Sequence, residues 1–334
     1  MDRKWKLDRR ATLKAIAIAT AVPAMLLRTG TAASAGFPDR PVKVVISTTP
    51  GGTLDQVARI MSEKMLPHLG QPLVVEYRPG ASGTVAANAV KNTPKDGYTI
   101  FFGAGSALGY QKLLEKDLPY DPIKDFTPVA MVGSVPVVIF TTPATGFNSI
   151  QDLLAAAKAK PGEISYGSVG PLTLPHLAAE LLQYRAGISM IHAPYAGSSG
   201  RYWTDLLGGR LQLVFTGASG GMGLVKAGKL KMLAVASRER SRLLPDVPAL
   251  GEVFPGLDVP AWFAFSVAAG TPAPIVQRLE EATLAALRDP STRQAFAQIG
   301  VDIDPILGSR ESEVKIRADN ETWEKVFKAA GLVK

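Results

Sequence analysis

The chain of 334 residues contains no cysteine and only three histidines. The absence of cysteine excludes disulfide bonds, thiolate metal sites and a cysteine nucleophile. It also agrees with an exported protein that does not depend on oxidative folding. The histidines His68, His176 and His192 are far apart in the sequence and show no metal-binding spacing. We therefore expect hydrogen-bonded structural histidines, and we predict neither a metal site nor a cofactor.

A strong charge of one sign is missing from most of the chain. The formal net charge is +8, but residues 1–35 hold seven of the Lys and Arg residues and only two acidic ones. The rest of the chain has 30 basic and 27 acidic residues, which are interspersed rather than clustered. Such a surface lacks the electrostatic footprint of a nucleic-acid-binding protein, so we predict no nucleic-acid partner.

A long apolar run occurs only near the N-terminus. It extends from Ala15 to Leu27, follows a basic segment and precedes Ala33-Ser34-Ala35, which together form the three-part pattern of an export signal. The run is short and is interrupted by Pro23, which disfavours a membrane anchor. We expect cleavage after Ala35 and a periplasmic mature protein. The pair Arg9-Arg10 favours the twin-arginine export route, and the general secretory route is the alternative.

The length and the 46% hydrophobic content are sufficient for two domains, each with its own core. Strand and helix patterns alternate after residue 41, which is typical of a parallel sheet covered by helices on both faces. Prolines interrupt this alternation between Leu118 and Pro143, and a second α/β pattern follows. We expect one domain of residues 36–140 plus 241–334, a second of 141–240, and hinges near 140 and 240.

The stretch 42–61 runs from a β-branched strand through Pro50-Gly51-Gly52 into a helix. Thr53 and Gln56 have the spacing of a capping box, so the helix should begin at Thr53. Such a turn collects unpaired N–H groups at the positive end of the helix dipole, which favours a carboxylate or a phosphate. A structural turn that binds nothing is the alternative. The segment from Gly103 to Ser106 should lie at the same edge of the sheet, where open α/β sheets bind ligands.

An exported hydrolase is the competing function. Gly217-Ala218-Ser219-Gly220-Gly221 matches the Gly-x-Ser-x-Gly nucleophile elbow and follows a predicted strand, which would make Ser219 the nucleophile. However, an α/β-hydrolase has its histidine after the serine, and all three histidines precede Ser219. Five small residues in a row are better explained by a flexible loop or a close backbone approach. We therefore predict a protein that is not an enzyme.

Short motifs follow one another in a distinctive order along the chain after residue 36. They are Phe37-Pro38-Asp39-Arg40-Pro41-Val42, Pro50-Gly51-Gly52, Leu69-Gly70-Gln71-Pro72, Arg78-Pro79-Gly80-Ala81, Asp96-Gly97-Tyr98-Thr99, Leu118-Pro119-Tyr120-Asp121-Pro122, Tyr166-Gly167-Ser168, His176-Leu177-Ala178, Pro194-Tyr195, Asp205-Leu206-Leu207-Gly208-Gly209, Leu244-Pro245-Asp246-Val247-Pro248 and Ala269-Gly270-Thr271-Pro272. This series resembles the extracytoplasmic solute receptors of the tripartite tricarboxylate transporter class, the Bug receptors. The resemblance covers essentially the whole chain after the export signal.

The resemblance implies the type II periplasmic binding-protein fold, in which two α/β domains hold a carboxylate-bearing ligand in the cleft between them. It also implies a monomer that works with membrane transporter subunits or in a sensing system. Loops of both domains would grip the ligand carboxylate, partly through ordered water. The implied ligand-binding residues are Thr48, Thr49, Gly51, Gly52, Thr53 and Ser106 in the first domain, and Ser168, Thr173, Tyr195 and Thr216 in the second.

Three departures from the family pattern bear on the ligand. Ser47-Thr48-Thr49 stands where an aromatic wall is usual, so the cleft should be more polar there. Thr216 replaces an acid that could pair with a ligand ammonium, which disfavours amino acids. The segment from Gly170 to Pro175 is bulkier than usual. Asp55 lies in the first helical turn, where we expect it to stabilise the helix rather than to bind the ligand. We predict a small carboxylic acid without an amine.

Overall fold

The computed structural model describes residues 36–195, 199–259, 261–303, 305–329 and 333. Pro38–Lys334 form one compact unit. The predicted export signal, its Arg9-Arg10 pair and the cleavage site at Ala35 lie outside the described residues. In the described ranges, no helix has both the length and the apolar character of a membrane span.

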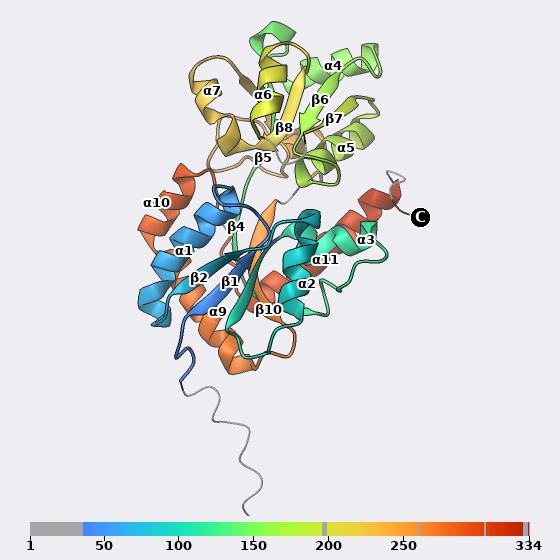
Figure 1. Ribbon diagram of the computed structural model, residues 1–334. Helices are drawn as coiled ribbons and strands as arrows, with labels where there is room; N and C mark the ends of the chain where they lie inside the picture. The colour runs from blue at the N-terminus through green and yellow to red at the C-terminus, as the bar shows by residue number, and fades with distance from the viewer. Residues whose placement is uncertain (1–35, 196–198, 260, 304, 330–332, 334) are drawn as a thin grey trace, which may run out of the picture. The chain divides into compact units, whose positions relative to one another are not determined.

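The first sheet has five strands in the order β2-β1-β3-β10-β4 (Figure 1). The strands are β1 (Val42–Ile46), β2 (Leu73–Tyr77), β3 (Thr99–Ala104), β4 (Phe126–Ser134) and β10 (Trp262–Ala268). β1 is parallel to both β2 and β3, whereas β10 is antiparallel to β3 and β4. Because β4 is antiparallel to β10, it runs in the same direction as β1, β2 and β3, so the expectation of a parallel sheet is right for four strands and wrong for β10. A strand parallel to β3 would have to begin at the end of the sheet where β3 begins. The chain instead returns from the second sheet at the end where β4 leaves, so β10 runs antiparallel to both neighbours.

The second sheet repeats this mixed pattern in the order β7-β6-β8-β5-β9. Its strands are β5 (Val137–Thr141), β6 (Ser165–Ser168), β7 (Ile191–Pro194), β8 (Leu213–Gly217) and β9 (Lys231–Val235). β6 is parallel to β7 and β8, while β5 is antiparallel to β8 and β9. We call the first sheet with its helices the first lobe, and the second sheet with its helices the second lobe.

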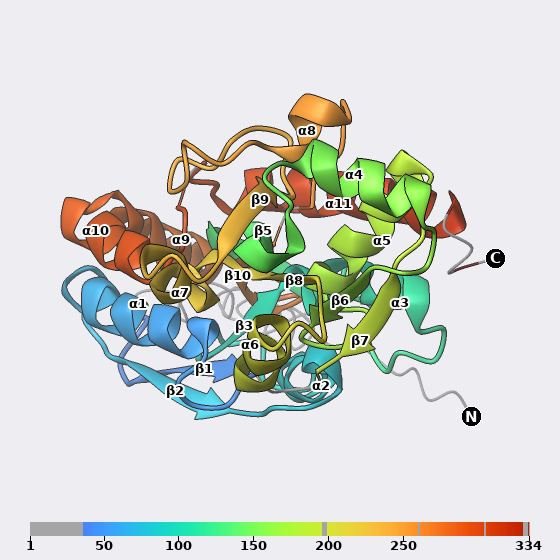
Figure 2. The same cartoon turned by 90° about the horizontal axis from the view of Figure 1, so that it is seen from above.

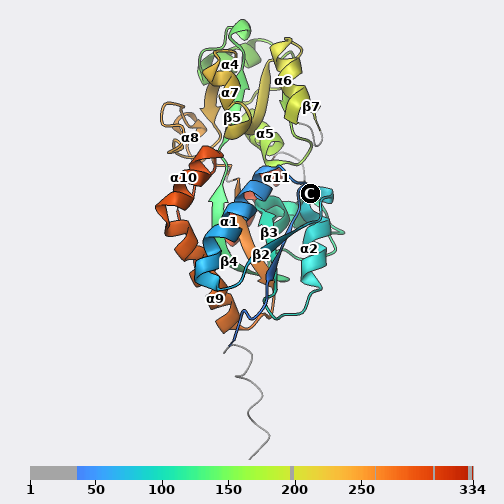
Figure 3. The same cartoon turned by 60° about the vertical axis from the view of Figure 1, so that its left-hand side comes forward.

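Helices cover both faces of each sheet (Figures 2 and 3). In the first lobe, α1, α9 and α10 lie on one face, and α2 and α11 lie on the other (Figure 1). The first-lobe helices are α1 (Thr53–Leu69), α2 (Thr84–Lys91), α3 (Gln111–Leu114), α9 (Ala273–Arg288), α10 (Pro290–Gln298) and α11 (Ser309–Ala329). The second-lobe helices are α4 (Ile150–Ala159), α5 (Leu174–Ala186), α6 (Ser199–Leu207), α7 (Met222–Lys226) and α8 (Leu250–Val253).

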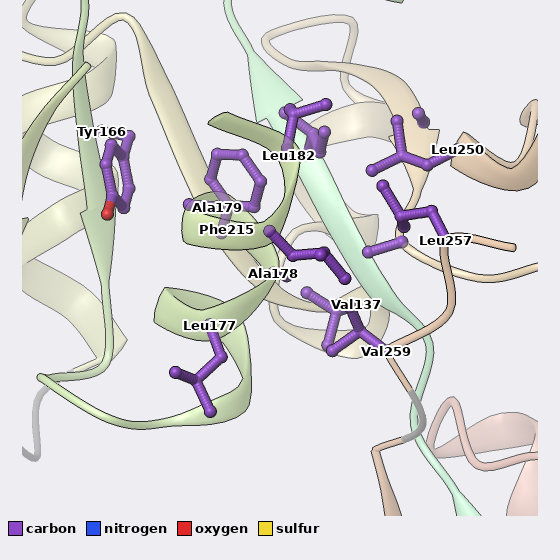
Figure 4. Packing of buried hydrophobic residues seen from close by; sticks show 14 of the residues in the cluster. Val137, Tyr166, Leu177, Ala178, Ala179, Leu182, Phe215, Leu250, Leu257 and Val259 are labelled. Atoms are coloured by element: carbon purple, nitrogen blue, oxygen red, sulfur yellow. The ribbon is translucent and has the colours of Figure 1, made fainter. Parts of the chain in front are cut away.

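The chain passes between the sheets twice. It leaves the first sheet after Ser134 and enters the second at Val137, a few residues before the hinge expected near 140. It returns to the first sheet only at Trp262. In between, Leu250, Leu257 and other buried residues still pack into the core of the second lobe (Figure 4). The expected domain boundaries at 140 and 240, and the hinges placed there, stay predictions.

Helix α11 contributes to both hydrophobic cores. Ile316 packs with first-lobe residues, whereas Trp323 and Phe327 belong to the large cluster that contains the second-lobe residues. The rings of Trp323 and Phe327 stack, with centroids 5.3 Å apart, and both contact Tyr110 of the first lobe. This aromatic group is therefore shared by the two lobes.

Candidate functional site

The turn between β1 and α1 has the predicted helix start but not the predicted cap. The helix begins at Thr53, as expected, and Gly52 is the N-cap without any side-chain cap. The capping box is wrong because Thr53 is already the first helical residue. Instead, Asp55 Oδ2 accepts a hydrogen bond from Gly51 N–H at 2.8 Å, and Gln56 Nε2 donates to Gly51 O at 3.2 Å. Gly51 has φ of +91°, a left-handed conformation that favours glycine.

The carboxylate of Asp55, in the first turn of α1, holds the β1–α1 turn through hydrogen bonds. Its side chain is buried and accepts hydrogen bonds from Gly51 N–H, from Tyr77 OH at 2.7 Å and from Arg59 Nε at 2.9 Å. Burial raises the pKa of Asp55, but the hydrogen bonds from Gly51, Tyr77 and Arg59 outweigh it, and the pKa lies below its ordinary value. The carboxylate is thus ionised and fully engaged by protein donors.

Three first-lobe loops meet at Gly83. A Cβ added there would stand 2.8 Å from the Cβ of Ala107 and 3.5 Å from that of Ser47. These neighbours flank the predicted ligand contacts Thr48 and Ser106, so the β1–α1 turn and the end of β3 come together as the parallel strands predict. Ser106 begins a single-turn π-helix that ends at Tyr110, a feature frequent at functional sites.

The loop before α2 is an element that the sequence did not single out for ligand binding. Gly80, Ala81, Ser82 and Gly83 have φ of 131°, 45°, 52° and 104° in succession. For alanine and serine this left-handed backbone costs about 1 kcal/mol or more each, and such strain concentrates at functional sites. The available signal was the pair of glycines that flank Ala81-Ser82.

The predicted second-lobe residues also lie near one another. Tyr195 N–H donates to Ser168 O at 2.9 Å, which joins the ends of β6 and β7. Tyr195 packs edge to face on Tyr202, and Tyr202 OH lies 3.3 Å from Thr216 Oγ1 at the end of β8. Thr173 Oγ1 donates to Gly170 O at 2.7 Å in the loop between β6 and α5.

The exposure of the ten predicted contacts differs widely. Thr49 and Gly51 are exposed, whereas Ser168 is fully buried and Thr216 is only 6% exposed. Burial and a 2.6 Å hydrogen bond to Asp205 raise the pKa of Tyr195 to about 12, so its hydroxyl stays neutral. Among the described residues, no hydrogen bond joins the first-lobe contacts to the second-lobe ones. All ten assignments therefore stay predictions.

Two histidines that appeared unrelated in the sequence are neighbours in the second lobe. The rings of His176 and His192 have centroids 4.2 Å apart, and Ser168 Oγ lies 2.8 Å from His192 Nε2. The parallel register of β6 and β7 places His192 opposite Tyr166, and α5 carries His176 to the same place. Within the described part of the chain, no group of three or more His, Cys, Asp or Glu side chains could hold a metal ion.

A pocket of about 590 Å³ lies where the chain crosses between the lobes. Its lining includes Val135, Asp258 and Trp262 from the crossovers and Arg238 and Lys315 beside them, but none of the ten predicted contacts. Cationic and anionic side chains both line it, so its charge does not select an anion.

Ser219, the candidate nucleophile of the hydrolase alternative, lies in a 3-10 turn directly after β8 and is exposed. A Cβ added at Gly300 would stand 3.0 Å from the Cβ of Ser219, so the turn approaches another backbone closely, as its small residues predict. Over the described ranges, no hydrogen bond links Ser219 to a histidine.

Known proteins resemble this chain in both sequence and fold. Residues 57–332 match the profile of the tripartite tricarboxylate transporter family receptors. A UPF0065 protein of Bordetella bronchiseptica is 33% identical over 327 residues, covering 98% of this chain and 94% of the relative. The solved structure of R. palustris Rpa4515 with adipate is 33% identical, with a TM-score of 0.79 and coverage of 89% of this chain and 99% of that one.

MatC from Rhodopseudomonas palustris, solved with bound malate, is 28% identical, with a TM-score of 0.74 and coverage of 87% of this chain and 99% of that one. These likenesses extend over both lobes and agree with the two mixed α/β sheets described above. The chain therefore belongs to the tripartite tricarboxylate transporter receptor family.

Proposed function

We propose that this chain is a periplasmic, monomeric and non-catalytic receptor that captures a small carboxylate without an amine and delivers it to membrane transporter subunits. Family membership supports the receptor role. Two solved relatives contain adipate and malate, both of which are dicarboxylates without an amine. The loops grouped at the carboxyl ends of the strands support a site at that edge.

The uncapped N-terminus of α1 is the observation that carries the carboxylate assignment. The N–H groups of Thr53, Leu54 and Asp55 have no acceptor within the helix, and no side chain caps them. The hydroxyl groups of Thr48 and Thr49 lie in the same turn. The Thr48 hydroxyl donates to Thr49 O at 3.4 Å, and the Thr49 hydroxyl adds a further donor. Together with the helix dipole, these donors favour an anionic oxygen.

The preference against an amine comes from the second lobe. Thr216, at the end of β8, offers a hydroxyl where a carboxylate would pair with an ammonium. Asp205 is the nearby acid, but it already accepts hydrogen bonds from Tyr195 and Arg210. An unpaired ammonium in a closed site costs roughly several kcal/mol.

Calorimetry on the mature chain tests this function with adipate, malate and succinate against aspartate and glutamate. We expect an amine-free acid to bind at least about tenfold more tightly than the amino acids, a difference of about 1.4 kcal/mol. A bound acid should be recovered unchanged by mass spectrometry. Tighter binding of aspartate or glutamate would contradict the ligand assignment, and any conversion of the acid would contradict the non-catalytic role.

The variant Gly52→Val locates the site. A Cβ at residue 52 stands 2.9 Å from Thr48 Oγ1, so the valine displaces that hydroxyl and occupies the approach to the helix N-terminus. Gly52 has an ordinary extended backbone, and the fold should tolerate the change. We expect affinity to fall by at least about tenfold. The control Gly223→Val adds the same side chain where there is open space, and equal affinity of both variants would place the ligand elsewhere.

A further inference from the structure

The buried hydroxyl of Ser168 connects β7 to the loop between β6 and α5. Ser168 Oγ lies 2.8 Å from His192 Nε2 and is also within 3.2 Å of both Gly170 N and Gly170 O. The serine is fully buried, so a ligand in solvent does not reach this hydroxyl in the observed conformation. Its contacts instead determine where the loop from Gly170 to Thr173 begins.

His176 holds the middle of the same loop. Leu172 N–H donates to His176 Nδ1 at 3.2 Å, so Nδ1 carries no proton and the proton of the neutral ring is on Nε2. Nε2 lies 3.7 Å from Glu180 Oε1. Leu172 has φ of 58°, a left-handed conformation that is costly for leucine. The hydrogen bond to His176 therefore stabilises a strained loop residue.

The two imidazoles form part of one stack. His192 lies between Tyr166, at a centroid distance of 4.9 Å, and His176, at 4.2 Å. Burial and the neighbouring His176 lower the pKa of His192 to about 4. Burial also lowers the pKa of His176, although Glu180 opposes this shift. Glu180 Oε1 already accepts from Tyr166 OH at 2.7 Å and from Gln183 Nε2 at 2.9 Å.

We propose that neutral His176 and His192 are positioning residues that hold the Gly170–Thr173 loop in its ligand-binding conformation, and that protonation of the pair releases the loop and the ligand. The proposal rests on the proposed function, because this loop carries the predicted contact Thr173. A proton on His176 Nδ1 would remove the acceptor of Leu172 N–H. Two cationic rings at this separation would also repel each other.

A Ser–His nucleophile is the alternative use of the same pair of atoms. Ser168 is fully buried, and Gly170 N–H donates to its oxygen. Among the described residues, His192 has no hydrogen-bonded carboxylate that would orient its ring as a catalytic base requires. The geometry thus fits a hydroxyl that links His192 to the backbone of Gly170 and so positions the loop, rather than one that attacks a substrate.

Nitrogen-15 NMR of the imidazoles in the ligand-free chain tests the geometry directly. The sequence contains only three histidines, and exposed His68 provides an internal reference. We expect His176 with Nδ1 unprotonated at about pH 7. Once the pair is protonated, the Leu172 amide should show a smaller protection factor against hydrogen exchange, measured relative to the intrinsic exchange rate at each pH. A cationic His176 or a proton on its Nδ1 at about pH 7 would overturn the proposal, whether or not a ligand is known.

The binding test compares His192→Gln with His192→Leu, using adipate as the probe. Glutamine keeps a polar group near the position of Nε2 but does not titrate, whereas leucine removes it. We expect His192→Gln to retain affinity within about threefold at pH 7, and His192→Leu to lose about tenfold. The ratio of wild-type to His192→Gln affinity cancels the titration of adipate itself. Because His192, with a pKa of about 4, is about half protonated at pH 4, this ratio should fall by about twofold from pH 7 to pH 4.

A constant ratio across this pH range would overturn the release step. Equal affinities of His192→Leu and the wild type, with both proteins folded by circular dichroism, would overturn the positioning role. If adipate binds neither protein, the carboxylate panel decides the proposed function, and the NMR result still decides the histidine geometry.

Discussion

Asp55 shows how one side chain can determine a binding turn without contacting the ligand. Its carboxylate lies at the positive end of α1 but is occupied by Gly51, Tyr77 and Arg59. The helix dipole stabilises this charge, and the charge in turn fixes Gly51 in its left-handed conformation. Asp55 accepts from none of the N–H groups in the first turn of α1, so these groups remain directed at the β1–α1 turn.

Replacing Asp55 by asparagine should lower the free energy of unfolding by roughly 1–3 kcal/mol at neutral pH, because a charged acceptor of three hydrogen bonds is lost. The pKa of Asp55 is depressed in the folded state, so its contribution is present above the unfolded pKa of about 3.9 and is lost as the pH falls through the folded pKa. Urea denaturation at a series of pH values should show the difference from wild type shrinking below about pH 4.

The control for this measurement is Asp117→Asn, at an exposed position, which should change the free energy of unfolding by less than about 0.5 kcal/mol. If Asp55→Asn behaves like this control, the carboxylate does not stabilise the turn.

Some site residues could be predicted from local sequence, and others could not. A glycine turn between a strand and a helix is visible in the sequence, so Gly51, Gly52 and Thr53 were identified correctly as the turn and the start of α1. The contact between His176 and His192 depends on the pairing of β6 with β7 and on the position of α5. No local pattern encodes that pairing, and the two histidines therefore appeared unrelated.

At the level of the element, the starts of helices α4 and α1 differ in which residue caps them. In α4, Ser149 is itself the N-cap, and both hydrogen bonds of its capping box with Asp152 are present. In α1, the N-cap is Gly52, and the hydroxyl of Thr53 is one position too late to perform this role.

Ser149→Ala should therefore destabilise the protein by about 1 kcal/mol, the usual cost of losing an N-cap side chain. Thermal unfolding followed by circular dichroism measures this loss. The exposed serine Ser219 supplies the matched control, and Ser219→Ala should change stability by less than about 0.5 kcal/mol. Equal melting temperatures for both variants would show that the cap of α4 contributes nothing to global stability.

The strands were predictable as elements, but their directions were not. All seven residues of β10 are buried, and such an apolar run indicates a central strand without indicating which way it points. The antiparallel orientation of β5 and β10 follows from where the chain crosses between the sheets. That information is distributed over the whole chain, and the family resemblance supplied the two-lobe architecture that periodicity could not.

At the scale of the whole molecule, we predict that the two lobes move as rigid bodies about the crossovers when ligand binds. The predicted contacts are divided between the lobes, so a ligand that engages both sets stabilises a closed arrangement. Small-angle scattering should give a smaller radius of gyration with a saturating carboxylate. The same carboxylate should leave the radius of Gly52→Val unchanged at a concentration that saturates only the wild type, and an unchanged radius of the liganded wild type would contradict closure.

The position of β10 has a consequence for the order in which the protein is assembled during synthesis. The second sheet uses strands that are consecutive in the chain, from Val137 to Val235. The first sheet needs β10 between β3 and β4, yet β10 ends at Ala268. On the ribosome, the edges of β3 and β4 that β10 will cover are thus unpaired while the entire second lobe is being translated, and unpaired strand edges are sites of aggregation. The sheet that begins first in the chain is therefore completed only after the sheet that begins second.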